Sequence, residues 1–202
     1  RFRYCTFEGG RYAFHAHFSE ISISRCVFRE NEEGVRLGVS RVEILDSVFT
    51  RNEIRGINFR ECRNVIRRNL VYGNGDGIFL HSKNSASVVR ENAIYANRNF
   101  NARMGDLHAD DIDLSGNWWG TADAAVIATK VYDYFDNPGY SPVVNFGHWL
   151  TAPGGAAAAP NTVSGPILSN TVWRAIDSPF AAVGSVLVTS NATLTIEPGV
   201  EV

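Results

Sequence analysis

The sequence has little of several features that mark other classes of protein. It has 3 cysteines among 202 residues, and this odd, low number argues against a disulfide framework. It has no apolar run long enough to cross a bilayer, so no transmembrane segment is expected. Leucine is scarce, which excludes a leucine-rich repeat, and no 3.6-residue apolar stripe supports helical repeats. The chain opens at Arg1 without a methionine or an apolar leader, so we expect a mature, processed or excised piece.

Charge is unevenly distributed, although the formal net charge is only -2. Residues 1–103 hold 16 arginines and Lys83 against 11 acids, a balance of +6. Residues 104–202 hold Lys130 and Arg174 against 10 acids, a balance of -8. A nucleic-acid-binding surface requires a basic stripe unrelieved by acids. Here arginines alternate with glutamates, so we expect a solvated face and no nucleic-acid partner.

A repeat of 21 to 24 residues runs through the first part of the chain. Six aromatic residues follow one another at spacings of 21, 21, 23, 23 and 24: Phe7, Phe28, Phe49, Tyr72, Tyr95 and Trp119. An aliphatic residue lies seven positions before the last five of them: Ile21, Val42, Val65, Val88 and Ile112. Asparagines follow two or three positions after the aromatics, and glycines then open short alternating runs: Asn31, Asn52, Asn74, Asn97, Gly34, Gly56 and Gly77.

This pattern predicts short strands joined by tight turns, because the apolar positions alternate with a period of two between Gly, Asn and Asp. Coils stacked about 4.8 Å apart give an all-β parallel solenoid in which equivalent residues form ladders. We therefore expect Phe28, Phe49, Tyr72 and Tyr95 to stack inside, each burying on the order of 150 Å² or more. The asparagines of the repeat should satisfy one another and the turn backbone.

Two further motifs lie toward the end of the repeat. They read Gly116-Asn117-Trp118-Trp119-Gly120-Thr121 and His148-Trp149-Leu150-Thr151-Ala152-Pro153. With them the chain resembles the secreted right-handed parallel β-helix repeat proteins, a group that includes pectate lyases and the periplasmic copper-site maturation protein. The resemblance implies a right-handed β-helix and an extracellular or cell-surface location. It implies no single activity, because the group mixes enzymes with structural and adhesive proteins.

The stretch from Asn97 to Ile112 is the place where a coil swells into a polar loop without obvious strands. This region carries the candidate ligand residues Arg103, Asp106, His108, Asp110, Asp111 and Asp113. Clustered carboxylates can hold calcium, and the resemblance implies lyases that use calcium together with an arginine base. Calcium is thus the one cofactor that the sequence suggests. A plain polar surface loop is the favoured alternative, and no catalytic residue is assigned.

Other candidate ligands have structural explanations. His15 and His17 alternate along one strand, which suggests a metal pair, but no third ligand is evident and a surface role is favoured. His81 follows a strand end and has no evident partner. Asp76, between two glycines, is explained by turn chemistry, although polygalacturonases use aspartates on this fold.

The cysteines are also expected to be structural. Cys5 and Cys26 occupy equivalent positions in successive coils, roughly 5 Å apart and so within disulfide range. Free inward thiols acting as small apolar side chains are the favoured state. Cys62 has no counterpart in the repeat.

After the coils of residues 1–120, we expect a helical and aromatic end cap over 121–150 and a linker over 151–165. Thr121 or Asp123 can cap a helix, whose apolar face would be Ala124, Ile127, Val131 and Phe135. The linker is rich in Ala, Pro and Gly.

Residues 166–202 return to strand alternation, as the opening strands of a second β-helix module or as an exchanged tail. One face would carry Leu194, Ile196, Val200 and Val202. Because exposed strand edges pair with other chains, these residues predict head-to-tail self-association into a ring or filament. A fragment of a longer tandem protein is the alternative.

Two classes of function remain. The favoured one is a non-catalytic extracellular module that acts as a rigid structural or surface subunit. The alternative is a carbohydrate-active β-helix that binds or cleaves an acidic polysaccharide. Repeats of 21 to 24 residues leave little room for substrate-gripping loops outside residues 97–112.

Overall fold

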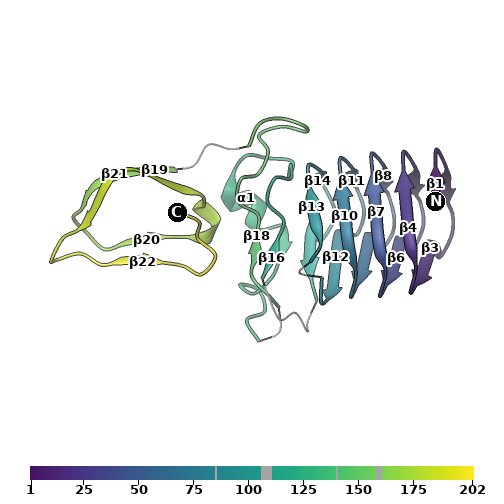
Figure 1. Ribbon diagram of the computed structural model, residues 1–202, viewed down its shortest axis with the longest axis horizontal. Helices are drawn as coiled ribbons and strands as arrows, with labels where there is room; N and C mark the ends of the chain where they lie inside the picture. The colour runs from purple at the N-terminus through teal and green to yellow at the C-terminus, as the bar shows by residue number, and fades with distance from the viewer. Residues whose placement is uncertain (85, 106–110, 140, 158–160) are drawn as a thin grey trace.

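The computed structural model describes residues 1–84, 86–105, 111–139, 141–157 and 161–202. Its strands stack into an elongated parallel β-solenoid, followed by a short α-helix and a smaller strand-rich segment (Figure 1). The all-β parallel β-helix expected from the repeat is therefore confirmed. Within the described ranges, no helix is both long and apolar enough to cross a membrane.

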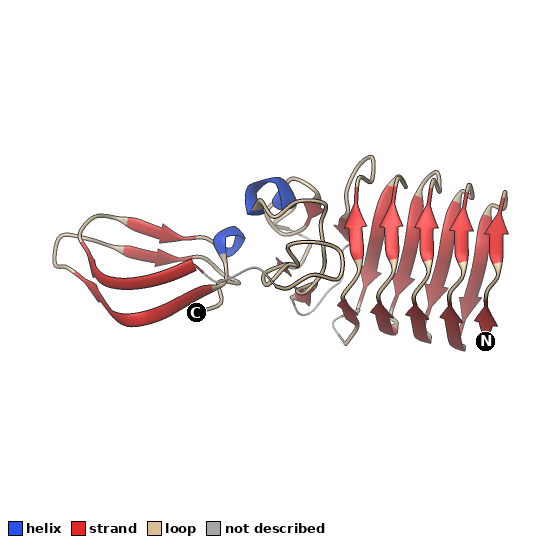
Figure 2. Ribbon diagram, turned by 90° about the horizontal axis from the view of Figure 1, so that it is seen from above, coloured by secondary structure: helices blue, strands red, loops and turns tan. Residues whose placement is uncertain are grey.

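Three parallel sheets form the walls of the solenoid, because successive coils place their strands side by side (Figure 2). The first sheet contains β1 (Phe2–Arg3), β4 (Glu20–Ser24), β7 (Arg41–Leu45), β10 (Arg63–Arg67) and β13 (Val88–Arg90). The second contains β2 (Thr6–Glu8), β5 (Val27–Arg29), β8 (Val48–Thr50), β11 (Leu70–Tyr72) and β14 (Ala93–Tyr95). The third contains β3 (Tyr12–His17), β6 (Glu33–Gly38), β9 (Arg55–Arg60), β12 (Asp76–Ser82), β15 (Ala102–Met104) and β17 (Val131–Tyr132).

The corner between the first and second sheets is made by one left-handed residue in each coil. Its φ is 56° at Tyr4, 54° at Arg25, 50° at Asp46 and 54° at Arg68. Residues other than glycine adopt this conformation uncommonly. Here the left-handed residue changes the direction of the chain from one sheet to the next. The hydrogen bonds between coils continue through this corner, since the Arg25 amide donates to the Leu45 carbonyl at 3.1 Å.

An aromatic stack fills the first coils. The rings of Phe7 and Phe28 lie 4.8 Å apart, and those of Phe28 and Phe49 lie 4.7 Å apart at an interplanar angle of 2°. Phe28 and Phe49 are fully buried. Val71 and then Ile94 continue this inward column.

The predicted aromatic stack was wrong from the fourth strand of the second sheet onward. Tyr72 and Tyr95 lie on the outer face, half-buried, with their rings stacked 5.7 Å apart. The reason is the register: Phe49 pairs with Val71, at a spacing of 22 residues, and Tyr72 pairs with Thr50. A shift of one residue moves a strand side chain to the other face of the sheet.

The asparagine ladder that the repeat predicted is confirmed. Each side-chain amide donates to the amide oxygen of the next coil, at 3.0, 2.8 and 3.0 Å, through Asn31, Asn52, Asn74 and Asn97. A second ladder, which the sequence reasoning missed, runs in the same sense through Asn69, Asn92 and Asn117. All seven side chains are buried, and paired amides avoid the loss of free energy that isolated buried amides would cause.

The three cysteines are free. Cys26 and Cys62 are buried and Cys5 is half-buried, as expected for inward thiols. The Sγ atoms of Cys5 and Cys26 donate to the carbonyls of Arg3 and Ser24, each at 3.3 Å.

The end of the solenoid is more regular than expected. The stretch from Asn97 to Ile112 was predicted to lack strands, but it contains β15, which pairs with β12 and extends the third sheet. Beyond it, β16 (Ile112–Asp113) pairs in parallel with β18 (Val144–Asn145).

The capping helix is present but shorter than predicted. It is α1 (Ala124–Ala128), and its N-cap is Asp123, whose side chain accepts from the amides of Ala125 and Val126. Val131, assigned to the helix face from sequence, instead begins β17 and pairs with Ala102. Phe135 is exposed.

The last segment forms two small parallel sheets. One pairs β19 (Asn161–Ile167) with β21 (Phe180–Val188), the other β20 (Thr171–Trp173) with β22 (Leu194–Ile196), and η1 (Ala175–Asp177) lies between β20 and β21. The linker prediction was wrong for residues 161–165, which belong to β19. Glu201 attaches the segment to the cap, because its Oε1 accepts from Asn145 at 2.6 Å and its Oε2 lies 2.8 Å from His148 Nε2.

Candidate functional site

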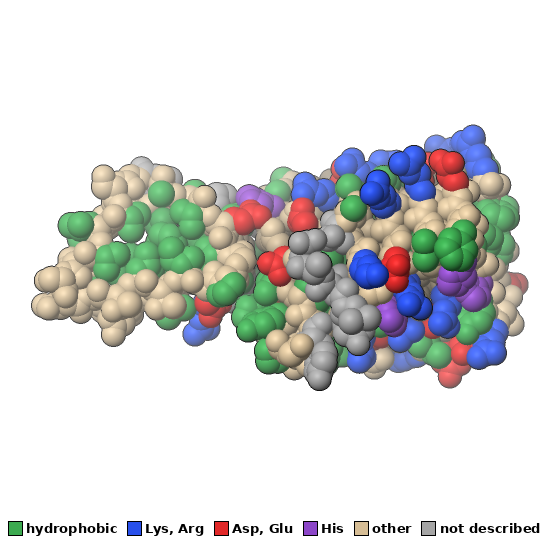
Figure 3. Space-filling model, turned by 60° about the horizontal axis from the view of Figure 1, so that its bottom comes forward, with side chains coloured by type: hydrophobic (Ala, Val, Ile, Leu, Met, Phe, Trp, Pro, Cys, Tyr) green, Lys and Arg blue, Asp and Glu red, His purple; other side chains and the backbone are tan. Residues whose placement is uncertain are grey.

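The outer face of the third sheet carries charged and aromatic side chains in register. One column contains Tyr12, Glu33, Arg55 and Asp76, and the next contains His15, Arg36, Asn58, Phe79 and Arg103. Each side chain of the second column from Arg36 to Phe79 follows a core residue by one position (Val35, Ile57 or Ile78), so strand alternation directs this column outward. Glu33 and Asp76 of the first column are buried. We call this surface the arginine face. Figure 3 shows basic side chains (blue) and histidines (purple) gathered on this side of the solenoid.

Glu33 is a buried carboxylate on this face, with 4% of its side chain exposed. Arg55 Nη1 lies 3.0 Å from Glu33 Oε1, and Asn58 Nδ2 donates to Glu33 Oε2 at 3.1 Å. Both carboxylate oxygens are therefore paired, which is the condition for a buried charge to be tolerated.

Asp76 lies on the other side of Arg55. Its Oδ2 is 3.9 Å from Arg55 Nε and 4.0 Å from Arg103 Nη1. Its Oδ1 is buried without a hydrogen-bond partner in the described part of the chain. The explanation of Asp76 as a turn residue was wrong, because it begins β12 and holds two arginines by charge.

Aromatic rings support the same guanidinium groups. The Arg55 guanidinium lies over the Phe79 ring, 4.1 Å from its centroid, and that of Arg103 lies over Tyr132 at 4.8 Å. Cation–π contacts of this kind hold a guanidinium in one orientation.

Two hollows lie on either side of Arg55 and Phe79, which line both of them. The first, of about 310 Å³, is lined by basic residues and histidines, with no carboxylate among its described lining residues: His17, Arg36, Arg55, Arg60 and His81, with Leu37, Asn58 and Phe79. The second, of about 380 Å³, shares Arg55 and Phe79 and extends to Arg103 and Tyr132. The first hollow therefore presents guanidinium groups at its lining, although Arg55 is paired with Glu33 at 3.0 Å and Arg60 with Glu61 at 3.5 Å.

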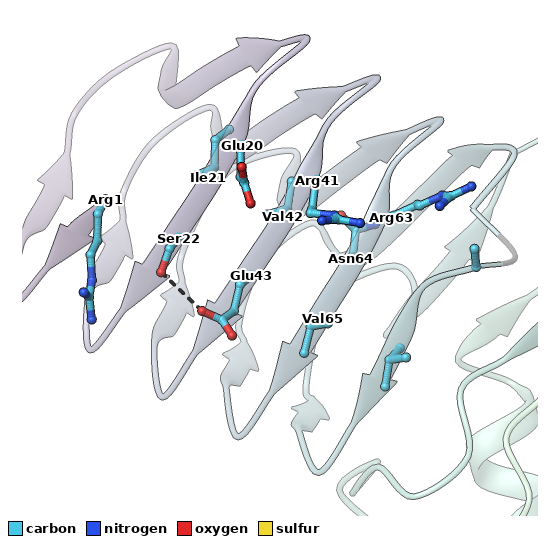
Figure 4. Close-up of a pocket in the computed structure, with 12 residues that line it drawn as sticks. Arg1, Glu20, Ile21, Ser22, Arg41, Val42, Glu43, Arg63, Asn64 and Val65 are labelled. Carbon is cyan, nitrogen blue, oxygen red and sulfur yellow. Dashed lines mark hydrogen bonds between the residues drawn. The ribbon is translucent and has the colours of Figure 1, made fainter.

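The outer face of the first sheet is a contrasting surface (Figure 4). Its hollow is larger, about 630 Å³, but both signs of charge line it, including Glu20, Glu43, Arg41 and Arg63. Val65, which the repeat aligns with Ile21 and Val42, is 38% exposed here. This mixture favours an anion less than the arginine face does.

The predicted calcium loop lies partly outside the described residues, which exclude Asp106, His108 and Asp110. The described members go to separate partners. Asp111 accepts from the Val143 amide at 3.1 Å, and Arg103 belongs to the arginine face. The calcium site remains a prediction.

Asp113 is the last residue of β16. Its Oδ1 accepts from the Ser115 amide at 2.9 Å, and its Oδ2 pairs with Arg90. Burial alone would raise the pKa of this carboxyl, but the Ser115 and Arg90 hydrogen bonds outweigh burial and lower it from its ordinary value of 3.8.

The sequence reasoning missed Glu33 and Arg55 and assigned Asp76 to a turn. A pattern for them existed, because each immediately precedes one of the glycines of the repeat, Gly34, Gly56 and Gly77. An acid, a base and an acid at equivalent positions of successive coils must lie side by side in a solenoid.

A family model described as "Periplasmic copper-binding protein (NosD)" matches residues 1–123. No curated protein matches the chain. No solved structure matches it either.

A copper site requires several nitrogen, sulfur or carboxylate ligands that lie together. No group of three or more His, Cys, Asp or Glu side chains lies together there. The thiols of Cys26 and Cys62 are buried, and burial raises the pKa of Cys62, which disfavours the thiolate that binds metal. The described residues therefore do not form a closed copper site.

Proposed function

We propose that this chain, which belongs to the NosD family of periplasmic proteins, is a rigid, non-catalytic extracytoplasmic module. We further propose that its arginine face binds an acidic polysaccharide. The observation that carries this proposal is the first hollow, whose described lining holds Arg36, Arg55, Arg60 and two histidines without a carboxylate. Guanidinium groups bind carboxylates through paired, charge-assisted hydrogen bonds.

The stacked coils give the face a regular spacing. Equivalent side chains recur about every 4.8 Å along the solenoid axis. Arg36 and Arg103 lie in one column, with Asn58 and Phe79 between them, so charged, polar and aromatic groups follow one another along a line. An extended polymer with carboxylates and flat sugar faces matches such a line better than a compact anion does.

Binding without cleavage is favoured by how the acids of the face are used. Glu33 is held by Arg55 and Asn58, and Asp76 is buried between two arginines. A general acid or base must reach the proton that it transfers. Neither of these carboxylates lines either hollow.

Affinity electrophoresis in polygalacturonate, with neutral dextran as the reference, tests this function. The Arg36→Ala/Arg60→Ala variant should lose at least about tenfold in affinity, since charged hydrogen bonds contribute about 1.5–3 kcal/mol each. Arg41→Ala/Arg63→Ala removes the same charge from the first sheet and should keep the parent affinity. Equal losses in both variants would show binding by net charge alone, and an ultraviolet-absorbing unsaturated product would show cleavage.

Head-to-tail assembly through Leu194, Ile196, Val200 and Val202 is a second part of the proposal. It is supported by exposed apolar side chains in the last segment, where Ile196 is 50% and Val202 68% exposed. In the described chain, β21 and β22 each pair on one edge only. Light scattering at increasing concentration should show growing species that Ile196→Lys reduces. A parent chain that stays monomeric throughout would exclude assembly.

A further inference from the structure

A further hollow, which we call the cap hollow, lies where the end of the solenoid meets the last segment. Its volume is about 480 Å³, a size typical of small-molecule sites. Here α1 contacts η1, and Figure 2 shows the two helices (blue) close to one another. Residues far apart in the sequence therefore form one concave surface.

The wall of the cap hollow is mostly apolar. Phe146 is 8% exposed and belongs to the packed core, whereas Phe135 is 56% exposed. The other apolar lining residues come from α1, β17, β18 and η1: Ala128, Val131, Val144 and Ala175. Such a lining favours a ligand with an apolar body, and the two rings can also face a cation.

Negative charge exceeds positive charge at this lining. Three carboxylates, those of Asp133, Asp136 and Glu197, oppose the single guanidinium of Arg174 among the described lining residues. Within the described part of the chain, none of these four side chains forms an ion pair. The protein itself therefore leaves a net charge of -2 in the cap hollow.

Asp133 is the most buried of the three acids, with 4% of the residue exposed. Its Oδ1 accepts from the Phe135 amide at 3.0 Å and its Oδ2 from the Val144 amide at 2.9 Å. These bonds orient the carboxylate but bring no positive charge to it. Burial raises the pKa of Asp133, and the neighbouring Asp136 raises it further. A bound cation would favour the ionised carboxylate.

The arrangement of the acids favours an organic cation over a metal ion. No group of three or more His, Cys, Asp or Glu among the described residues lies close enough together to hold a metal. A protonated amine needs no such closed shell of ligands, and its carbon body can pack on the apolar wall.

We propose that the cap hollow binds a small organic cation, a protonated amine attached to an aromatic or branched apolar body. The cap hollow shares no described lining residue with the two hollows of the arginine face. This site is therefore independent of the proposed polysaccharide function.

A chemical-shift titration of the full chain by nuclear magnetic resonance tests the site with three related probes. Phenethylammonium should bind at least about fivefold more tightly than 2-phenylethanol, which has the same ring and chain without the charge. Phenylalanine, which adds a carboxylate, should bind more weakly than phenethylammonium. Equal binding of the amine and the alcohol, tighter binding of phenylalanine, or no binding of the amine would overturn the proposal.

Two variants with opposite expected effects show whether the lining charges act on the ligand. Asp136→Asn should weaken phenethylammonium binding, and Arg174→Gln should tighten it, each by about twofold to fivefold. Tighter binding cannot come from a damaged fold. The matched control Glu53→Gln removes an exposed carboxylate outside the cap hollow and should keep the parent affinity. Weaker binding in Arg174→Gln, or an equal loss in Glu53→Gln and Asp136→Asn, would contradict the site.

Discussion

Arg55 and Glu33 form an ion pair between adjacent coils, with Arg55 Nη1 3.0 Å from Glu33 Oε1 and the Glu33 side chain 4% exposed. Arg51 and Glu30 lie nearby in the same two coils, also paired at 2.7 Å, but both of their side chains are more than half exposed. The two pairs share their chemistry and differ in burial, so they allow the energetic effect of burial to be measured.

Arg55→Met should lower the free energy of unfolding by about 3–5 kcal/mol, because it leaves the Glu33 charge buried and unpaired. Arg51→Met should change it by at most about 1 kcal/mol. Urea denaturation of the full chain measures both. Arg55→Met/Glu33→Gln should recover part of the loss, and a double variant no more stable than Arg55→Met would contradict the pairing.

Phe49→Ala should destabilise the chain by about 3–5 kcal/mol, because it empties a fully buried position in the aromatic stack. Tyr72→Ala, on the outer face, should lower stability by only about 1–2 kcal/mol. Thermal unfolding followed by circular dichroism compares them. The reverse order would refute the register of the second sheet.

Asn74→Ala should break the first asparagine ladder in the middle. It leaves the Asn52 amide group and the Asn97 amide oxygen without their ladder partners, at about 1–3 kcal/mol for each buried group. Asn99→Ala is the control, because Asn99 is exposed, and its effect should stay within about 0.5 kcal/mol. Equal effects in urea denaturation would show that the ladder adds no stability.

Asp113→Asn should make the free energy of unfolding fall less steeply as the pH is lowered. The folded-state pKa of Asp113 is lowered, so the carboxylate stabilises the fold above its ordinary pKa of 3.8, and this contribution disappears as the pH falls through the folded value. The half-exposed pair with Arg90 limits the effect to at most about 1 kcal/mol. Urea midpoints between about pH 6 and pH 2 measure it. An Asp113→Asn curve that runs parallel to that of the parent would contradict the assignment.

The repeat predicted the solenoid because a coil of this length can bury its apolar face only against its neighbours. It failed on register, since aromatic spacing alone does not distinguish Tyr72 from Val71 when the coil grows from 21 to 22 residues. Only the backbone pairing of Phe49 with Val71 decides which residue points inward.

The arginine face was harder to predict than the core. Glu33 and Asp76 are charged residues in a solvated pattern, and charge alone indicates exposure. Their burial follows from Arg55, Asn58 and Arg103 on neighbouring strands, contacts that no single coil contains. The cap was mispredicted for a similar reason, because Val131 fits a helix face locally but pairs with Ala102 as a strand.

The asparagine ladders also determine how the length of this protein can change. Every rung donates in the same direction, from one coil to the next, so any coil offers the same oxygen below and the same N–H groups above. If a whole coil is removed, the two coils that then meet present the same ladder donors and acceptors to each other. If one residue is removed, the side chains of the following strand move to the opposite face of the sheet. Insertions and deletions of whole coils should therefore be tolerated, and each would change the length of the solenoid by about 4.8 Å.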